Sequence, residues 1–439
     1  MSRLSRRAAG ALTALVAVAT TLAVLPATSG AANEKPAAPE VGVTATEIHL
    51  AVVADVDNAI APGILKGQVD GVKAAAQYVN QQGGVAGRKL VIDFYDSKLN
   101  PTEARNAFIN ACENDLAMTG TGTFLISSVD DIVNCKDQSG QAIGIPDIPG
   151  VTTGTLEACS PVSFPLNGSQ IDCSTATSST PTYRMQAGDT QYLQKKYGPL
   201  KGPMIVSSDS AATQKSSTII GVAAKQNGID ITNTVAVSSR DPQTVYTPVI
   251  QQIKNDGDNF VDSGTPAEGV IAMRSEAQLQ GLTDPKFTWA CLLNCYDKKM
   301  IAAGSAVDDT HASIAFLPFE EAKSNKTLSA FVKLVPKDSQ EGFAVWGWTA
   351  TLAMAEVLKN VAADKGVNGI TRANVLEGIK NFHKFNAGGM YANVDIGSKV
   401  PSPCFNMVLL KSGKYSREYP TKKATFDCKQ SNLKTLQGS

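Results

Sequence analysis

The residues best suited to chemistry are short polar clusters that each follow an apolar run. Their hydroxyl, amide and carboxylate groups can hold a small polar or zwitterionic solute by hydrogen bonds, with help from backbone N–H groups at helix starts. The clusters occupy residues 55–58, 120–123, 152–153, 207–209, 262–264 and 294–296. Whether they converge on one site depends on the elements that precede them.

Signals for enzyme chemistry are weak. The segment 150–154 has the spacing of a nucleophile elbow, but with Thr152 in the serine position, and a glycine-bounded turn is the simpler interpretation. Glu320 and Glu321 could form an acid pair for sugar hydrolysis, although adjacent carboxylates usually lie on a solvated face. Metalloprotease, phosphate-loop and complete dinucleotide motifs are absent from the sequence. We therefore expect a protein that is not an enzyme and needs no cofactor.

The eight cysteines indicate disulfides in an oxidising compartment. Their order along the chain favours pairs between sequence neighbours, although other connectivities stay open. The expected pairs are Cys112–Cys135, Cys159–Cys173, Cys291–Cys295 and Cys404–Cys428. The last-but-one pair has three intervening residues rather than the two of a redox motif, and none of the three histidines is close to a pair. We therefore expect no metal site.

The N-terminus predicts export. Arg3, Arg6 and Arg7 precede an apolar run over 8–25, Pro26 and a small-residue stretch, which is the order of a signal peptide. We assign residues 1–32 to it, with cleavage near residue 31 or 32. An uncleaved anchor is the alternative, because the run is almost long enough to span a bilayer. The arginine pair also permits the twin-arginine route.

The mature chain is expected outside the cytoplasm, either extracellular or in the cell envelope. No cysteine lies near the expected cleavage region, so the usual bacterial lipoprotein acceptor is missing. Residues 33–43, rich in Ala, Pro and Glu, predict a flexible leader. Basic and acidic residues are equal at 40 each, which gives no reason to expect nucleic acid as a partner. We expect a monomer.

Strand and helix patterns alternate from residue 48. Apolar runs at 48–53, 90–95, 116–118 and 143–151 predict strands, and helices are expected between them. Residues 155–182, rich in Ser, Thr and Pro, interrupt this alternation of strands and helices. The alternation restarts with strands expected at 204–206, 231–237, 260–261 and 287–290, followed by later strands at 313–316 and 405–410. Two such runs predict an α/β protein with two lobes, each built on a parallel sheet.

In parallel α/β sheets, ligands bind beyond the carboxyl ends of the strands. We therefore predict a small-molecule site from the polar clusters, although each residue alone could simply cap a helix. The predicted ligand residues are Asp57, Ser127, Ser128, Thr152 and Thr153 in the first lobe and Ser208, Asp209, Gly264 and Tyr296 in the second. Asp209 would meet an ammonium or amide donor, and Tyr296 would cover an apolar part of the ligand.

Four stretches carry a family resemblance. They are 67–89 with its double glycine, 95–104 with Asn100-Pro101, 259–282, and the helix that begins Gly347-Trp348-Thr349-Ala350. The chain resembles the type I periplasmic binding proteins, in particular the Leu/Ile/Val-binding branch that serves ABC importers. The first stretch is the most specific.

The resemblance implies two Rossmann-like lobes that close on a ligand through a hinge of three crossing strands. The first lobe would take residues 44–180 and 297–398, and the second 181–296 and 399–439. The crossings would lie near Pro181, Tyr296 and Pro401.

Several residues depart from the family pattern. Ser127 and Ser128 come later than the serine that usually holds an amino-acid carboxylate, and the segment 209–212 lacks its tyrosine. Trp348 and Thr349 replace the usual Tyr-Asp. An amino acid, an amide, a small acid or a more apolar compound are all open as ligands. The resemblance implies a solute-capturing partner of an ABC permease, and a ligand sensor that signals through a membrane partner is the alternative.

Overall fold

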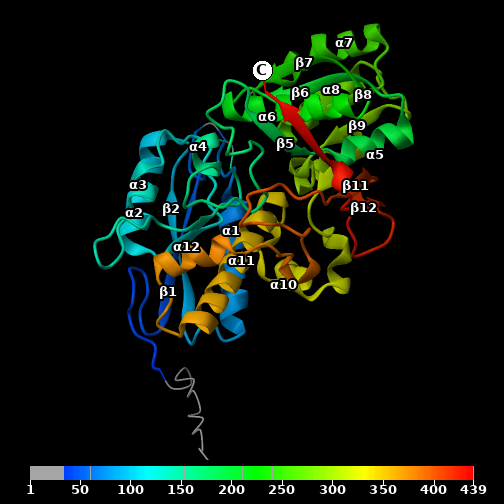
Figure 1. Ribbon diagram of the computed structural model, residues 1–439. Helices are drawn as coiled ribbons and strands as arrows, with labels where there is room; N and C mark the ends of the chain where they lie inside the picture. The colour runs from blue at the N-terminus through cyan, green and yellow to red at the C-terminus, as the bar shows by residue number, and fades with distance from the viewer. Residues whose placement is uncertain (1–33, 60, 153, 210, 239–240, 439) are drawn as a thin grey trace, which may run out of the picture. The chain divides into compact units, whose positions relative to one another are not determined.

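The computed structural model describes residues 34–59, 61–152, 154–209, 211–238 and 241–438 (Figure 1). The segment predicted as a signal peptide, 1–32, lies outside these ranges. Residues 35–439 form one unit. Within the described ranges, no helix has both the length and the apolar character needed to cross a bilayer.

The first sheet has four parallel strands in the order β2-β1-β3-β4. Their bounds are Glu47–Ala54 for β1, Lys89–Asp96 for β2, Ala117–Thr119 for β3 and Asp147–Ile148 for β4. The helices packed around it are α1 (Lys66–Gln81), α2 (Pro101–Asn114), α3 (Asp130–Val133), α10 (Lys326–Leu334), α11 (Gly342–Lys365) and α12 (Arg372–Lys380). In Figure 1, α2 and α3 lie on one side of β2, and α1 and α11 on the other. The parallel sheet with helices on both faces is the predicted arrangement.

Two helices begin and pack as the sequence predicts. The Asn100 side chain accepts hydrogen bonds from the amides of Thr102 and Glu103, and Pro101 opens α2. In α1, residues Val69, Val72, Ala76 and Val79 recur at helical spacing and are all buried.

The second sheet has seven strands in the order β12-β11-β10-β9-β8-β6-β7. The bounds are Lys201–Ser207 (β6), Asp230–Val237 (β7), Phe260–Ser263 (β8), Thr288–Cys291 (β9), Thr310–Ile314 (β10), Asn406–Lys411 (β11) and Lys414–Tyr419 (β12). Pairing is parallel from β7 to β10 and antiparallel from β10 to β12. The antiparallel edge adds to the predicted parallel sheet.

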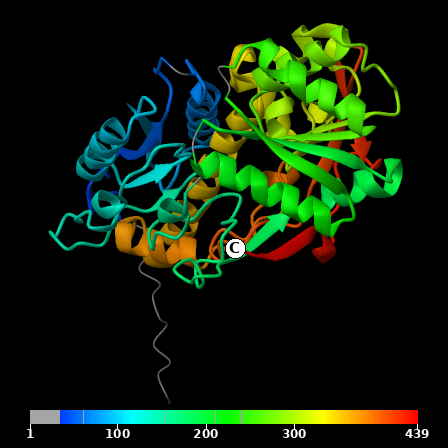
Figure 2. The same cartoon turned by 90° about the horizontal axis from the view of Figure 1, so that it is seen from above.

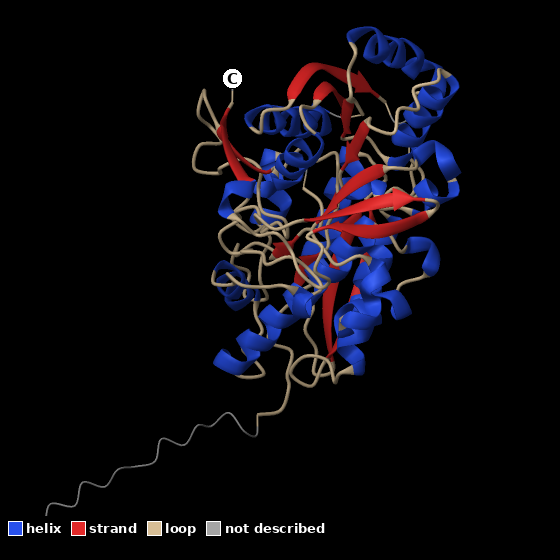
Figure 3. Cartoon of the chain, turned by 90° about the vertical axis from the view of Figure 1, so that its right-hand side faces the viewer, coloured by secondary structure: helices blue, strands red, loops and turns tan. Residues whose placement is uncertain are grey.

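Helices cover both faces of the second sheet (Figure 3). They are α5 (Gly188–Tyr197), α6 (Ala211–Gln226), α7 (Tyr246–Asp256) and α8 (Ala267–Leu279). Alternate residues of β6 enter different cores: Met204 packs in the cluster that contains Ala223 of α6, and Ile205 in the cluster that contains Ile250 of α7.

Strands β5 (Thr182–Gln186) and β13 (Leu433–Gln437) form a separate antiparallel pair. Figure 2 shows this pair beside the C-terminus. The sequence patterns missed both strands. The short helices α4 (Thr155–Ala158) and α9 (Lys298–Ala302) complete the α-helices.

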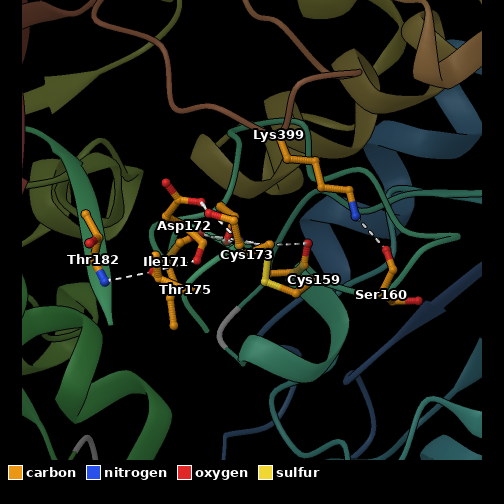
Figure 4. Close-up of a disulfide and its surroundings, with 11 residues drawn as sticks. Cys159, Ser160, Ile171, Asp172, Cys173, Thr175, Thr182 and Lys399 are labelled. Atoms are coloured by element: carbon orange, nitrogen blue, oxygen red, sulfur yellow. Dashed lines mark hydrogen bonds between the residues drawn. A yellow bond between two sulfur atoms is a disulfide. The ribbon is translucent and has the colours of Figure 1, made fainter. Parts of the chain in front are cut away.

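The segment 155–182, which interrupts the alternation of strands and helices, is hydrogen-bonded to a later part of the chain (Figure 4). It contains the Cys159–Cys173 disulfide, and Lys399 Nζ donates to the carbonyl of Ser160 at 2.5 Å. The Thr182 amide donates to Thr175 Oγ1 at 2.9 Å at the start of β5. All four predicted disulfide pairings are present.

Some sequence expectations need correction. The strand expected over 143–151 pairs only at β4 and at a bridge from Val151, because Pro146 and Pro149 have no N–H to donate. Residues 35–43, expected as a flexible leader, make hydrogen bonds: the Ala37 amide donates to Asn368 Oδ1 at 2.7 Å, and Glu40 is buried.

The division into lobes stays a prediction, but the sheet pairing bears on one boundary. Strand β10 falls within 297–398, which was assigned to the first lobe, yet it pairs with β9 and β11 of the second sheet. This favours a crossing after Ile314 rather than near Tyr296.

Candidate functional site

The carboxyl edge of the first sheet brings three loops side by side. Gly122 bridges Ala54 at the end of β1 on one side and Val151 after β4 on the other. The loops that follow β1, β3 and β4 therefore run in parallel along this edge, as expected for a ligand-binding edge of an α/β sheet.

The Asp55 side chain is buried beneath this edge and holds its loops together by hydrogen bonds. Asp55 is 1% exposed, and its Oδ1 accepts from Ser97 Oγ at 2.6 Å and from the Leu99 amide at 2.7 Å. Its Oδ2 accepts from the Phe124 amide at 2.8 Å. One carboxylate thus fixes the loops after β1, β2 and β3 relative to one another.

The predicted first-lobe residues are distributed along these loops. Asp57 is exposed, and its amide donates to Asp96 Oδ2 at 2.8 Å. Thr152 is half-buried on the adjacent loop, and Thr153 lies outside the described residues. Ser127 is exposed, and Ser128 Oγ accepts from the Asp130 amide at 3.0 Å at the start of α3. Asp57 and Thr152 therefore lie on neighbouring loops of the edge, whereas Ser128 makes a local hydrogen bond just before α3.

The predicted second-lobe residues follow β6 and β8. Ser208 and Asp209 are exposed, and Asp209 Oδ1 accepts from Ser238 Oγ at 2.6 Å. The Gly264 amide donates to the Ile205 carbonyl at 2.9 Å. A Cβ on Gly264 would come within 2.5 Å of Ser217 Oγ, so this loop needs glycine to approach α6. The two loops thus lie at the same edge of neighbouring strands.

The structure gives Tyr296 a different role from the predicted one. It is only 2% exposed, and its ring lies 4.6 Å from that of Tyr415 and 4.9 Å from that of Phe319. Its hydroxyl donates to Glu320 Oε2 at 2.8 Å and accepts from the Phe319 amide at 2.7 Å. Burial, followed by the Glu320 carboxylate, raises the pKa of Tyr296. A side chain packed in this way contributes to the core and cannot cover a ligand in this conformation.

An apolar rim at the first edge was missed by the sequence patterns. We use this name for four half-buried side chains, Ile64, Phe124, Phe343 and Trp346. They pack on a buried cluster that includes Ala54, Leu65 and Val151. Phe343 and Trp346 meet edge to face, with ring centroids 5.6 Å apart. The rim comes from three separate segments, because Phe343 and Trp346 both lie on α11, and the only local signal is the aromatic start of the helix at 343.

Gln68 connects helix α1 to this edge. It is fully buried, and its Nε2 donates to the Gly120 carbonyl at 2.6 Å. A Cβ on Gly122 would lie 2.4 Å from the same nitrogen. Only a glycine backbone can therefore pass this close to α1, which explains the Gly-Thr-Gly sequence at 120–122.

Buried acids stand behind the first edge. Burial raises the pKa of Asp147 to about 7, although Thr121 Oγ1 donates to it at 2.9 Å. Burial also raises the pKa of Glu157, with further contributions from Asp147 and Asp55. Glu341 caps α11 beside the rim, where its carboxylate accepts from the Phe343 amide at 3.1 Å and burial raises its pKa to about 8. None of the rim residues is basic.

Leu293 and Asn294 touch elements of both sheets. Leu293 follows β9 and packs on Gly342 at the start of α11, where a Cβ would come within 2.5 Å of Leu293 Cδ1. Asn294 Nδ2 donates to the Thr265 carbonyl, which follows β8. This segment is a physical link between the two candidate edges.

Glu320 and Glu321, which were considered as an acid pair for sugar hydrolysis, have another role. The solvated position expected for both is wrong for Glu321, which is buried. Glu321 is 6% exposed and takes a two-pronged contact from Arg417, from Nε at 2.5 Å and Nη2 at 2.9 Å. Glu320 accepts from Tyr296. Both carboxylates are engaged in holding the chain together.

Comparisons with known proteins agree with this architecture. A family model described as periplasmic binding protein matches residues 47–414. The chain therefore belongs to the periplasmic binding protein family, and its resemblance to the Leu/Ile/Val-binding-like type I members of ABC transporters is confirmed. A search of curated proteins finds no match.

Solved structures share the fold at low sequence identity. A fatty acid ABC transporter substrate-binding protein from Thermomonospora curvata is 17% identical, with a TM-score of 0.64 over 88% of this chain and 97% of that one. A branched-chain amino acid ABC transporter protein from Thermus thermophilus with bound valine is 13% identical, with a TM-score of 0.65 over 88% and 98%. A substrate-binding protein from Aeropyrum pernix is 16% identical, with a TM-score of 0.66 over 87% and 98%. The fold is that of a two-lobed type I periplasmic binding protein.

Proposed function

We propose that the protein captures a small molecule outside the cytoplasm and presents it to an ABC importer. The observation that carries this proposal is the alignment of the loops after β1, β3 and β4 at one edge, beside the apolar rim. Family membership supports it, because the related structures named above are ABC transporter proteins. The ligand would lie between this edge and the loops after β6 and β8.

The side chains favour a ligand with an apolar body and one polar end. The rim supplies aromatic surface, and Thr152 and Ser208 offer hydroxyls for a carbonyl or carboxylate. The family's early serine and its second-lobe tyrosine are missing, which argues against an ordinary amino-acid ligand. One related structure is named for a fatty acid and another for valine, so the fold itself accepts ligands of different polarity.

Native mass spectrometry of the purified mature protein tests the proposal. We expect a carried-over small molecule that leaves on mild denaturation. Calorimetry with that molecule should then show weaker binding for Trp346→Ala and Thr152→Ala, by several-fold or more.

Leu279→Ala provides the matched control, since Leu279 is 76% exposed on α8, away from both edges. It should leave the affinity unchanged. Unchanged affinity in Trp346→Ala and Thr152→Ala, at unchanged melting temperature, would show that the ligand binds elsewhere. Uptake of the molecule by cells that lack this protein would contradict the transport role.

A further inference from the structure

A second cluster of chemically active side chains lies on the first sheet, away from the ligand edge. His49 of β1 and Asp93 of β2 meet with Nδ1 and Oδ2 2.7 Å apart. Asp115, between α2 and β3, completes the group, and one ligand atom from each residue lies within 4.8 Å of the others. Because His49 lies in the first half of β1 and the candidate ligand edge follows Ala54, the two places are separate along the strand.

Asp115 is the residue that requires an explanation. It is 0% exposed, and its Oδ1 has no hydrogen-bond partner among the described residues. Its Oδ2 accepts from the Tyr95 hydroxyl at 3.0 Å. A buried carboxylate oxygen without a donor is costly, and a second carboxylate at Asp93 adds repulsion. Such a pair needs a proton or a cation between its oxygens.

The surroundings leave room for a cation to enter. A cavity of about 450 Å³ opens at this cluster and is lined by Gly42, Val43, Thr44, His49, Asp93, Tyr95 and Asn114. His49 and Asp93 are half-exposed at its wall, while Asp115 is buried. An ion that enters through this cavity would meet His49 and Asp93 first, with a ligand atom of Asp115 within 4.8 Å of theirs, and would keep water on its open side.

We propose that His49, Asp93 and Asp115 form a binding site for a first-row divalent cation, with Zn²⁺ as the best fit. One imidazole and two carboxylates, with a fourth position left to water, match the mixed nitrogen and oxygen ligands that Zn²⁺ accepts. Bonds of about 2.0–2.2 Å in a tetrahedral site separate ligand atoms by about 3.4 Å. The cluster reaches that spacing with a modest inward movement of half-exposed side chains.

Two outer contacts would hold the ligands in place. The Tyr95 hydroxyl orients Asp115 through Oδ2, and Arg372 Nη2 donates to the Asp115 carbonyl at 2.6 Å. A bound cation would therefore join β1, β2 and the chain before β3, and its role would be structural.

Zinc titration of chelator-treated mature protein tests the site. We expect one Zn²⁺ per chain by elemental analysis and a higher melting temperature on binding. His49→Gln and Asp115→Asn should each weaken binding by more than about tenfold. Co²⁺ in place of Zn²⁺ should give visible absorption bands in the unaltered protein, so the test does not depend on a variant that folds.

The chain provides a matched control. His383 Nδ1 lies 2.8 Å from Asp395 Oδ1, an equivalent pair for which the structure shows no second carboxylate among the described residues. His383→Gln should leave the zinc stoichiometry and affinity unchanged. Equal loss in both histidine variants, or a preference for Ca²⁺ over Zn²⁺, would overturn the proposal.

A proton is the alternative occupant. Burial, with a contribution from Asp93, raises the pKa of Asp115 to about 8, so a proton can hold the pair together near neutral pH. If only a proton binds, Zn²⁺ will not change the melting temperature and Asp115→Asn will be as stable as the unaltered protein. That result would also overturn the proposal.

Discussion

At the scale of single residues, a few buried polar groups determine the geometry of the candidate edge. Asp55 is the main one, because its two oxygens accept hydrogen bonds from three positions on two other loops. In the sequence it was one more polar residue after an apolar run. Its neighbour Asp57, which we predicted as a ligand residue, is exposed.

The first prediction concerns this contrast. Asp55→Ala removes three hydrogen bonds and leaves the Leu99 and Phe124 amides without their acceptor. We expect a loss of about 2–3 kcal/mol in the free energy of unfolding, measured by urea denaturation.

Asp57→Ala is the control and should change the free energy of unfolding by less than about 0.5 kcal/mol, because its side chain is exposed. If the two variants are equally stable, Asp55 does not organise the edge.

The second prediction concerns acid stability. Burial alone would raise the pKa of Glu418, but hydrogen bonds from His311, Lys196 and Tyr197 outweigh it and hold the pKa at about 2, below its ordinary 4.5. A carboxyl group with a lowered pKa stabilises the fold above its ordinary pKa, and this contribution is lost as the pH falls from 4.5 toward 2. Glu418→Gln should therefore flatten the decline of the melting temperature over that window.

The same variant should cost about 3 kcal/mol at neutral pH, because it removes the buried carboxylate that pairs with Lys196 and accepts hydrogen bonds from His311 and Tyr197. Glu377→Gln, on the exposed side of α12, is the control. Thermal melts from pH 2 to pH 7 give both quantities. A Glu418→Gln profile parallel to that of the unaltered protein would contradict the assignment.

At the scale of elements, two helices cross closely through glycine. A Cβ on Gly71 of α1 would lie 2.1 Å from the Ala344 carbonyl oxygen, and one on Gly347 of α11 would lie 2.1 Å from the Gln68 carbonyl oxygen. These positions fall in two of the stretches that carry the family resemblance. The close packing of α1 against α11 therefore explains why glycine occupies these positions in the segments 67–71 and 347–350.

The third prediction follows from this crossing. Gly71→Ala should lower the free energy of unfolding by about 1–3 kcal/mol, because the opposing backbone must move. Gly221→Ala in α6 is the matched control, since its new Cβ would meet only the Met204 side chain, with Cγ at 3.4 Å and Cβ at 3.5 Å. We expect that control to be neutral or stabilising by up to about 1 kcal/mol. Thermal unfolding that ranks the two variants in the opposite order would contradict the close crossing.

The elements also show which parts of the structure the sequence could predict. Alternating strands and helices, the cap at Asn100 and the local disulfides were predictable because they depend on neighbours in the chain. Strands β12 and β13 were missed, since their residues are mostly polar and their pairing is with distant segments. The burial of Tyr296 could not be predicted, because its partners Glu320 and Tyr415 lie far along the chain.

The candidate site likewise has features that the sequence could predict and features that it could not. Its position at the carboxyl edges was predictable from the order of the elements. The apolar rim was not, because Ile64, Phe124 and Trp346 come from separate segments. The cluster at His49, Asp93 and Asp115 was not predictable for the same reason, since its three residues are separated by more than 20 positions in the sequence.

At the scale of the whole molecule, the proposed function requires that ligand binding beside the first sheet also affects the second sheet. The segment that holds Leu293 and Asn294 is the best-defined link, because it packs on α11 and hydrogen-bonds to the loop after β8. Helix α11 in turn carries Phe343 and Trp346 of the apolar rim. Ligand that orders the rim would thus act on α11 and, through Leu293, on the second sheet.

The last prediction tests this coupling. We expect ligand binding to reduce the radius of gyration measured by small-angle X-ray scattering, as in hinge closure. Gly342→Ala places a Cβ within 2.5 Å of Leu293 Cδ1 and should disturb the link without touching the loops after β1, β3 and β4. We therefore expect a several-fold weaker ligand affinity and a smaller change in the radius of gyration, while Gly221→Ala behaves like the unaltered protein. A Gly342→Ala variant with unchanged affinity and an unchanged scattering difference would show that closure does not pass through Leu293, and the chain crossings near Pro181, after Ile314 and near Pro401 would then be the next place to look for the hinge.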